Sequence, residues 1–458
     1  MEGELDGEIM KTLLFLFSVL LGAVNCLGQA TEPPPPAATG VQVADTNPLP
    51  RYEDNVRPLS GVQNFDLGTR TEYMNVLIPA FTFSGSYGTN PGLQTGTQGA
   101  TVWGYTTNVG GSLDMMRGSA ARLFSMSYRG SAQLNSYNSS LNTQIHSLDI
   151  TESVTAGRWT YVLGDTLAYQ PNAYGAYAPL LFPGIGTGTP GGGLQTGTTP
   201  NDTVLTSQNT QLSNTSIGQV TYGLSRASSV TGSISYGILH YFEGDLLDSH
   251  QLNATGGFDH RFGRNTMGVS YTHSRFMYDN IDQDFYTNTI HLTYGRRVIG
   301  RFSLSLEAGP TLRTLTTGSI SSISTDVSGS ASFQYTSNRS NIGLSYARAV
   351  TGGAGVMIGA LTDTVSLSAE RRLSRTLSIN ATAGYSKNSE INRGNTGTGT
   401  DYKTFFVGTG VSQQIGRYLS LGLGYRGQRQ TSDLAAANLT SHSAVVTIQW
   451  RFRPLRLE

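Results

Sequence analysis

The side chains best suited to chemistry in this chain are its seven histidines, at positions 146, 240, 250, 260, 273, 291 and 442. No two of them follow the close spacing that zinc ligands use. A serine hydrolase would need a serine, a histidine and an orienting group side by side. Serine is plentiful, and His240, His260 and His273 share one face of their predicted strands. A phospholipase-type activity is therefore a minor alternative, and the sequence predicts a protein that is not an enzyme.

Two further features resemble ion or cofactor sites. Asp279, Asp282 and Asp284 crowd one predicted external turn, where they could hold calcium or bridge lipopolysaccharide through cations, but their spacing does not match a dedicated calcium loop. Residues 184–193 are rich in glycine and lack the Gly-Lys-Ser/Thr ending of a phosphate-binding loop. We interpret the aspartates as a solvated turn and the glycines as a flexible loop, and we expect no metal and no cofactor.

The elements that carry these residues are strands with one apolar and one polar face. Residues 302–309, 377–385 and 419–426 alternate leucine, isoleucine, alanine or an aromatic residue with serine, threonine, asparagine or glycine. The last strand alternates in the same way, with an apolar row at Ala444, Val446, Ile448, Trp450 and Phe452. Such a strand must lie between an apolar and a wet environment. The pattern is typical of a transmembrane β-barrel.

Composition agrees with this class of protein. Only 13% of the 458 residues are charged, against a typical share of about 25%. The net charge is zero, which gives no indication of a nucleic-acid partner. Cys26 is the only cysteine, so disulfides are excluded.

The first residues predict export across a membrane. Residues 1–30 read as a signal peptide, and the acidic stretch before Met10 suggests that Met10 is the physiological start. Lipidation of Cys26 is a minor alternative. Residues 31–78 contain the proline run 33–36 and no clear periodicity, so we expect a largely disordered periplasmic segment, with a tether or a plug for the barrel as the alternative. Residues 79–458 then form the outer-membrane barrel.

Alternation and turn chemistry place about eighteen strands. Their expected spans are 79–88, 105–117, 121–134, 142–156, 159–170, 216–226, 229–242, 248–262, 266–278, 284–295, 301–314, 323–336, 340–350, 361–371, 375–388, 401–415, 417–430 and 439–452. The connections alternate between short and long, as periplasmic turns and external loops do. An even number of strands returns both termini to the periplasm. The predicted fold is all-β, an antiparallel up-and-down transmembrane barrel.

Parity divides the notable side chains between the two faces. The candidates for an aromatic girdle at the membrane surfaces are Trp159, Phe302, Phe333, Tyr346, Tyr385, Tyr425, Trp450 and Phe452. The candidates for the lumen are Glu307, Arg313, Glu370, Arg426, Gln449 and Arg451. The lumen candidates form no ladder of one sign, so strong ion selectivity is not expected.

The chain resembles bacterial outer-membrane β-barrel proteins of the porin-like type, over residues 79 to 452 and the signal peptide. In that family the last strand ends in an aromatic residue that the barrel-assembly machinery recognises, and Trp450 and Phe452 match. Residues 453–458 follow the aromatic residue here, which departs from the family pattern. The third external loop of porins folds into the channel, and the resemblance implies the same for residues 171–215. A surface lid is the alternative, since this loop is apolar at 177–183 and carries one charge, Asp202.

These features predict a multi-pass protein of the bacterial outer membrane that passes small hydrophilic solutes by diffusion. Its lumen width and third loop would set selectivity. Two alternatives are an export channel for a polymer such as an exopolysaccharide and a non-conducting structural or adhesive barrel. The expected partners are membrane lipid, lipopolysaccharide, the assembly machinery through the C-terminal strand and the solute itself; the oligomeric state is left open.

Overall fold

The computed structural model describes residues 75–90, 101–119, 121–136, 138–139, 142–171, 204, 210–242, 246–279, 281, 283–298, 301–317, 320–353, 355–391, 400–433 and 438–457. All of them lie in one compact unit, Pro50–Glu458. The predicted signal peptide, and the predicted periplasmic segment up to residue 74, lie outside the described residues. No described segment is a helix long and apolar enough to cross a membrane.

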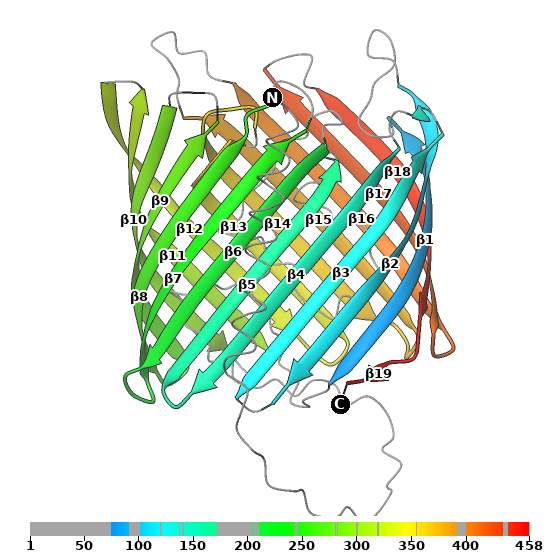
Figure 1. Ribbon diagram of the computed structural model, residues 1–458, viewed down its shortest axis with the longest axis horizontal. Coiled ribbons are helices and arrows are strands. Elements are labelled where there is room, and N and C mark those ends of the chain that lie inside the picture. The colour runs from blue at the N-terminus through cyan, green and yellow to red at the C-terminus, as the bar shows by residue number, and fades with distance from the viewer. Residues whose placement is uncertain are drawn as a thin grey trace, which may run out of the picture. The chain divides into compact units, whose positions relative to one another are not determined.

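Eighteen long strands and one short one make up the described structure (Figure 1). They are β1 (Val76–Thr89), β2 (Trp103–Gly118), β3 (Arg122–Asn135), β4 (Thr143–Ala156), β5 (Trp159–Pro171), β6 (Thr210–Gly223), β7 (Ser228–Tyr241), β8 (Ser249–Phe262), β9 (Asn265–Tyr278), β10 (Gln283–Val298), β11 (Phe302–Thr317), β12 (Ile320–Thr336), β13 (Ser340–Thr351), β14 (Ala360–Arg372), β15 (Leu377–Glu390), β16 (Asp401–Ile415), β17 (Leu419–Ser432), β18 (Leu439–Arg451) and β19 (Leu455–Arg456).

Each long strand pairs antiparallel with its neighbours in sequence, and the ring closes between the first and the last. In that closing pair Ala80 lies opposite Arg451 and Gly88 lies opposite Ser443. Closure leaves no free sheet edge, which is the condition for strands to satisfy their backbone groups within hydrocarbon. The predicted fold, an all-β antiparallel up-and-down barrel of eighteen strands, is confirmed.

The chain continues beyond the aromatic end of β18. Residues Leu455 and Arg456 form β19, which pairs with Leu77 and Val76 of β1. The Phe452 amide donates to the Pro79 carbonyl over 3.0 Å, and the Leu457 amide donates to that of Asn75 over 3.0 Å. The tail that departs from the family pattern therefore extends the closing seam of the barrel.

We call the two rims of the barrel the turn end and the loop end. The turn end carries the connections 119–121, 157–158, 224–227, 263–264, 299–301, 337–339, 373–376 and 416–418. The loop end carries 90–102, 136–142, 172–209, 242–248, 279–282, 318–319, 352–359, 391–400 and 433–438. The chain enters β1 and leaves β18 at the turn end (Figure 1).

Most strand boundaries lie within three residues of the prediction, and the start of β6 and the connection between β11 and β12 are the informative differences. β6 begins at Thr210, six residues before the expected start at 216. β11 and β12 run on until only residues 318 and 319 separate them, so the expected strict alternation of connection lengths is wrong at this point. Polar pairs such as Thr316 with Ser321 extend this hairpin beyond its apolar rows. Apolar alternation marks the part of a strand that faces an apolar environment, whereas backbone pairing continues into water.

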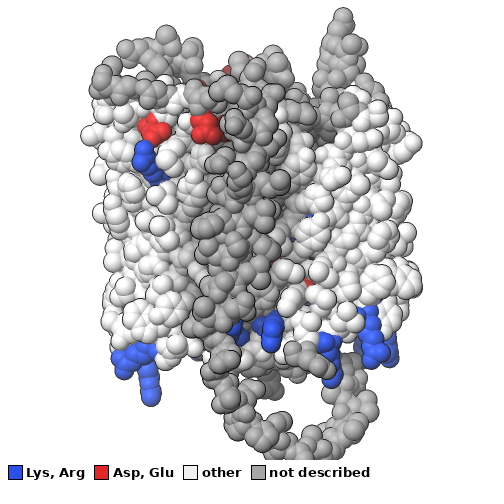
Figure 2. All heavy atoms as spheres, viewed as in Figure 1, with Lys and Arg blue, Asp and Glu red and all other residues white. Residues whose placement is uncertain are grey.

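The two faces of the sheet separate as the alternation predicts. Leu423 and Trp450 point outward, with 61% and 50% of their surface exposed, whereas Gln449, next to Trp450, is 3% exposed. The visible outer wall in Figure 2 is almost free of charge between its two rims. Serine, threonine, asparagine and glutamine dominate the opposite face. The outer face therefore suits lipid and the inner face suits polar solutes.

Candidate channel wall and mouth

The sequence-predicted lumen residues share the inward parity of their strands. Glu307 and Arg313 alternate with the outward-facing Leu306 and Leu312 on β11. Glu370 lies two positions from Ser368 at the turn end of β14, and Arg426 lies on the inner row of β17. Gln449 and Arg451 follow each other on the inner row of β18. Their contribution to a solute path remains a prediction.

Two pairs of opposite charge lie on the inner wall. Arg313 on β11 lies 3.1 Å from Asp326 on β12. Arg129 on β3 lies 3.8 Å from Asp114 on β2. Asp114 also accepts a hydrogen bond from Ser127 over 2.7 Å. The wall therefore presents pairs of opposite charge in place of a field of one sign.

Side-chain hydroxyls form a chain across three neighbouring strands of this wall. Thr289 on β10 lies 2.9 Å from Thr311 on β11, and the Thr311 hydroxyl lies 2.6 Å from that of Ser328 on β12. The Ser328 hydroxyl lies 2.8 Å from Nε2 of His291. Beside them the Ser330 hydroxyl donates to the Glu307 carboxylate over 2.9 Å. This region pairs its polar groups with one another while keeping hydroxyls on the inner face.

The inner face becomes apolar at the loop end. Phe276 and Phe285 are 2% and 0% exposed, and their rings stack with centroids 4.3 Å apart. Tyr278 joins them, and Leu247, Ile281, Leu315, Ile358 and Ile391 pack around this cluster. The cluster combines inward residues of β9 and β10 with residues of several connections. The mouth of the barrel is therefore narrowed by packed side chains.

The connection between β13 and β14, residues 352–359, crosses part of this mouth. We call it the mouth bridge. The Leu247 amide, in the β7–β8 connection, donates to the Gly355 carbonyl over 2.8 Å, and the Tyr278 hydroxyl donates to the Gly352 carbonyl over 2.9 Å. In the ring, β9 to β12 lie between β8 and β13. The mouth bridge thus joins strands that are not neighbours.

Glycine is required at three points of the mouth bridge, Gly353, Gly355 and Gly359, where φ is positive and a β-carbon would collide with its surroundings. Gly355 and Gly359 have φ of +73° and +75°, a region that other residues rarely adopt. A β-carbon at Gly355 would collide with the Tyr241 ring, and one at Gly359 would collide with Phe285. The backbone approaches these rings closely because neither residue has a side chain.

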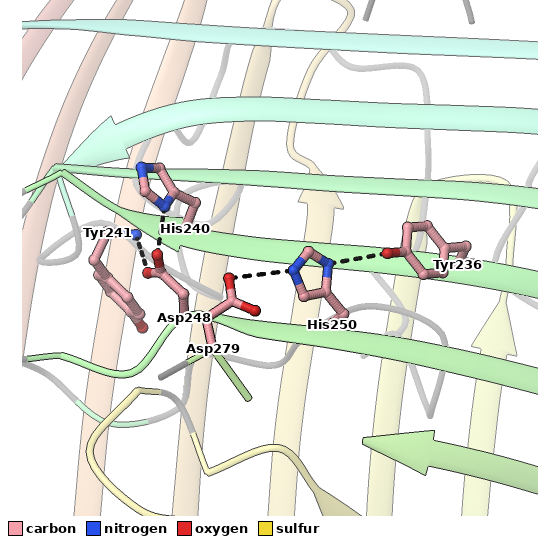
Figure 3. Close-up of polar contacts among 6 residues, drawn as sticks. All are labelled: Tyr236, His240, Tyr241, Asp248, His250 and Asp279. Atoms are coloured by element: carbon pink, nitrogen blue, oxygen red, sulfur yellow. Dashed lines mark hydrogen bonds and ion pairs between the residues drawn. The ribbon is translucent and has the colours of Figure 1, made fainter. Parts of the chain in front are cut away.

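An aspartate anchors the connection that receives the mouth bridge (Figure 3). Oδ2 of Asp248 lies 2.6 Å from Nδ1 of His240, and its Oδ1 accepts the Tyr241 amide over 2.8 Å. Nearby, His250 lies between the Tyr236 hydroxyl at 3.0 Å and the Asp279 carboxylate at 3.4 Å. These contacts hold the β7–β8 connection against the ends of its strands and so fix the position of Leu247.

Apart from the residues that belong to β5 and β6, the structure describes one residue of the predicted third external loop, residues 171–215. Val204 is 1% exposed and packs in a cluster with Met357, Ala360 and Tyr402 at the loop end. Met357 is part of the mouth bridge, so this point of the 171–215 loop contacts it. Asp202 and the apolar run 177–183 lie outside the described residues, and so does the glycine stretch 184–193.

Sequence reasoning did not single out the mouth bridge, Asp326 or the Phe276–Phe285 pair. The run Gly352-Gly353-Ala354-Gly355 followed by Val356-Met357-Ile358 was a usable signal, because three apolar residues are unusual in a solvated loop. If the sequence had been read with a two-residue turn at 318–319, the antiparallel register of this hairpin would have placed Asp326 close to Arg313.

Seven of the predicted girdle residues are exposed on the outer face. Four lie near the turn end, at Trp159, Phe333, Trp450 and Phe452, whereas Tyr346, Tyr385 and Tyr425 lie near the middle of their strands. The Phe302 ring packs 4.8 Å from Tyr335. Their part in anchoring the barrel at the two membrane surfaces remains a prediction.

The predicted metal and hydrolase features are dispersed. Asp279 contacts His250, Asp284 lies 2.8 Å from Arg275, and Asp282 lies outside the described residues. No group of three possible metal ligands occurs among the residues that the structure places. The hydroxyl of Ser228 lies 2.8 Å from Nδ1 of the outward-facing His260. No carboxylate in the described part of the chain contacts that ring.

Comparison with known proteins finds one family model that is similar to a C-terminal part of the chain. Residues 324–452 match the family model described as putative beta-barrel porin 2. No curated protein sequence matches the chain.

Solved structures of outer-membrane proteins are similar in fold. OccK9 (OpdG) of Pseudomonas aeruginosa is 11% identical with a TM-score of 0.42, over 82% of this chain and 98% of that one. A BenF-like porin of Pseudomonas fluorescens Pf-5 is 12% identical with a TM-score of 0.41, over 84% and 100%. The ferric-catecholate import receptor Fiu of E. coli K12 is 9% identical with a TM-score of 0.41, over 84% and 82%.

The closed antiparallel ring with its apolar outer face is the architecture of a transmembrane β-barrel, and residues 324–452 of this ring are similar to a beta-barrel porin family.

Proposed function

We propose that this barrel lets small, mainly uncharged hydrophilic solutes cross the outer membrane by passive diffusion. The observation that carries the proposal is the inner wall, where Arg313 pairs with Asp326 and Arg129 with Asp114. The hydroxyls of Thr289, Thr311 and Ser328 lie beside these pairs. Such a wall offers hydrogen bonds to polar solutes and repels neither sign of charge strongly.

The mouth bridge supports selection by size in this proposal. It joins β13 and β14 to the β7–β8 connection at the loop end, and the Phe276–Phe285 cluster packs beneath it. Val204 brings one point of the third loop to the same place. We propose that the mouth bridge and this loop together set the largest solute that enters.

Planar-bilayer recordings of the full-length mature protein test the function. We expect stepwise conductance in potassium chloride that decreases when small sugars or short polyethylene glycols enter the channel, and that is unaffected by long ones. Conductance blocked only by a long polysaccharide would instead support polymer export. No conductance from protein shown to be folded would support a structural or adhesive barrel.

Removing one member of a wall pair should create ion selectivity. Arg313→Gln leaves the Asp326 carboxylate without its partner, so the reversal potential in a salt gradient should shift towards that of the cation. Asp326→Asn should shift it towards that of the anion, and the double variant should return to the parent value. Identical shifts from the two single variants would contradict a shared position on the solute path.

The remaining assignments belong to the same proposal. We propose that the turn end faces the periplasm, because the chain enters and leaves the barrel there and a signal peptide is predicted before it. Lipopolysaccharide would then surround the loop end, and the assembly machinery would engage β18 with its terminal Trp450 and Phe452. A hydrolytic role is not proposed, because the Ser228–His260 pair has no carboxylate partner among the placed residues.

A further inference from the structure

Arginine occurs at every connection of the turn end. Arg117 and Arg122 flank the first connection, and each of the others contains at least one arginine. The tail after β18 continues the series with Arg453 and Arg456. We call the following residues the arginine ring: Arg158, Arg226, Arg264, Arg301, Arg339, Arg375, Arg417 and Arg453. All eight are exposed.

The arginine ring lacks acidic partners. Within the described ranges no carboxylate lies within ion-pair distance of any of its members. Of the carboxylates near this rim, Glu152 pairs with Arg122 and Asp114 with Arg129, whereas Asp259 is buried on the inner face and Glu370 lies at the end of β14. Figure 2 shows lysine and arginine side chains along the lower edge of the visible face, which is the turn end. The rim therefore carries an uncompensated positive charge around its circumference.

Three of the five outward basic residues in the described strands near the loop end have an acidic partner, and Lys403 and Arg429 have none within ion-pair distance among the described carboxylates. There Arg275 lies 2.8 Å from Asp284, Arg348 lies 3.1 Å from Asp363, and Lys387 lies 3.6 Å from Asp401. These outward basic residues have an acidic neighbour on the adjacent strand. Eight bare arginines at the turn end, against two bare cations at the described loop end, indicate that their partner lies outside the described residues of the chain.

The depth of the arginine ring identifies that partner. Arg158 directly precedes Trp159, Arg301 precedes Phe302, and Arg453 follows Phe452. Aromatic residues in this position mark the boundary between hydrocarbon and headgroups. The guanidinium groups one residue further out can therefore reach the phosphates of that leaflet.

The type of cation agrees with phosphate as the ligand. The chain has only three lysines, Lys11, Lys387 and Lys403, and none lies in a described connection of the turn end. A guanidinium group binds phosphate through two parallel hydrogen bonds, whereas an ammonium group acts as a point charge. We propose that the arginine ring binds the phosphate groups of anionic phospholipids in the leaflet at the turn end.

Fluorescence quenching by brominated lipid tests this proposal, because the three tryptophans divide between the rims. Trp159 and Trp450 lie beside the arginine ring, and Trp103 lies at the loop end. A Trp103→Phe variant reports from the turn end alone. In phosphatidylcholine vesicles, we expect brominated phosphatidylglycerol to bind around these tryptophans at least about fivefold better than brominated phosphatidylcholine. A ratio of about five is the preference that one arginine near an anionic surface would give.

Variants then assign the preference to the arginine ring. Combining Arg158→Gln, Arg417→Gln and Arg453→Gln in the same background should bring the ratio close to one, and the corresponding lysine variants should give an intermediate ratio. Arg275→Gln with Arg348→Gln, a matched change at the loop end, should leave it unchanged. A variant with Trp103 as its sole tryptophan should show no preference.

Two results would overturn the proposal. One is a ratio near one in the parent, or a preference that survives the triple glutamine change, with folding verified by heat-modifiable gel mobility. The other is loss of the preference when inorganic phosphate replaces chloride at equal ionic strength, which would make free phosphate the ligand. Quenching does not depend on conduction, so this test is independent of the proposed transport function.

Discussion

Replacing Leu421 with arginine should lower the free energy of unfolding by about 1–2 kcal/mol, between the cost of a basic residue on the lipid face at the middle of the bilayer and that at its surface. Leu421 is exposed on the outer face, two residues from the start of β17 and one outward pair from the Leu419–Trp450 pair. An arginine there would have to be desolvated in hydrocarbon or distort the bilayer. Urea unfolding of the protein in lipid vesicles, followed by tryptophan fluorescence, measures the change.

The adjacent residue supplies the control for this prediction. Ser420 has the inward parity and lies opposite Gln449 across the β17–β18 pair. Ser420→Arg should therefore be tolerated and should shift ion selectivity towards anions in the bilayer assay. Equal destabilisation by both variants would contradict the assignment of inner and outer faces.

Much of the barrel could be predicted because every strand that crosses a membrane needs an apolar face towards lipid and a polar face towards the lumen. Residues 439–452 were expected as a strand from their alternation, and β18 spans Leu439–Arg451. With a side-chain period of two, the apolar row of β18 also fixes which residues face the lumen. The same rule placed Glu307 and Arg313 on one face without any knowledge of the hairpin that contains them.

The mouth could not be predicted in this way, because its contacts join distant connections. Leu247 and Gly355 belong to loops on separate hairpins, and their backbone hydrogen bond leaves no periodic pattern in either segment. The resemblance to porins directed attention to the third loop, residues 171–215. Most of that loop lies outside the described residues, and the described contacts at the mouth come mainly from the β13–β14 connection, with Val204 as the single described residue of the third-loop connection.

Displacing the mouth bridge should enlarge the channel entrance. Gly355→Val places a branched side chain at a φ of +73°, against the Tyr241 ring, so the native path of residues 352–359 becomes inaccessible. The backbone strain alone is on the order of 1–3 kcal/mol, and the collision adds to it. We expect a higher single-channel conductance and the entry of longer polyethylene glycols, with the barrel still folded because the eighteen-strand ring is untouched.

A second variant and a matched glycine separate displacement from general strain. Leu247→Pro removes the amide that donates to the Gly355 carbonyl, so it should enlarge the entrance without altering the mouth bridge itself. Gly416→Val imposes the same kind of strain at a φ of +67° in the turn end, where a β-carbon has open space around it. It should leave conductance and polymer entry unchanged. If all three variants conducted like the parent, the mouth bridge would not limit the channel, and the narrowest point would lie deeper along the wall that carries Arg313 and Asp326.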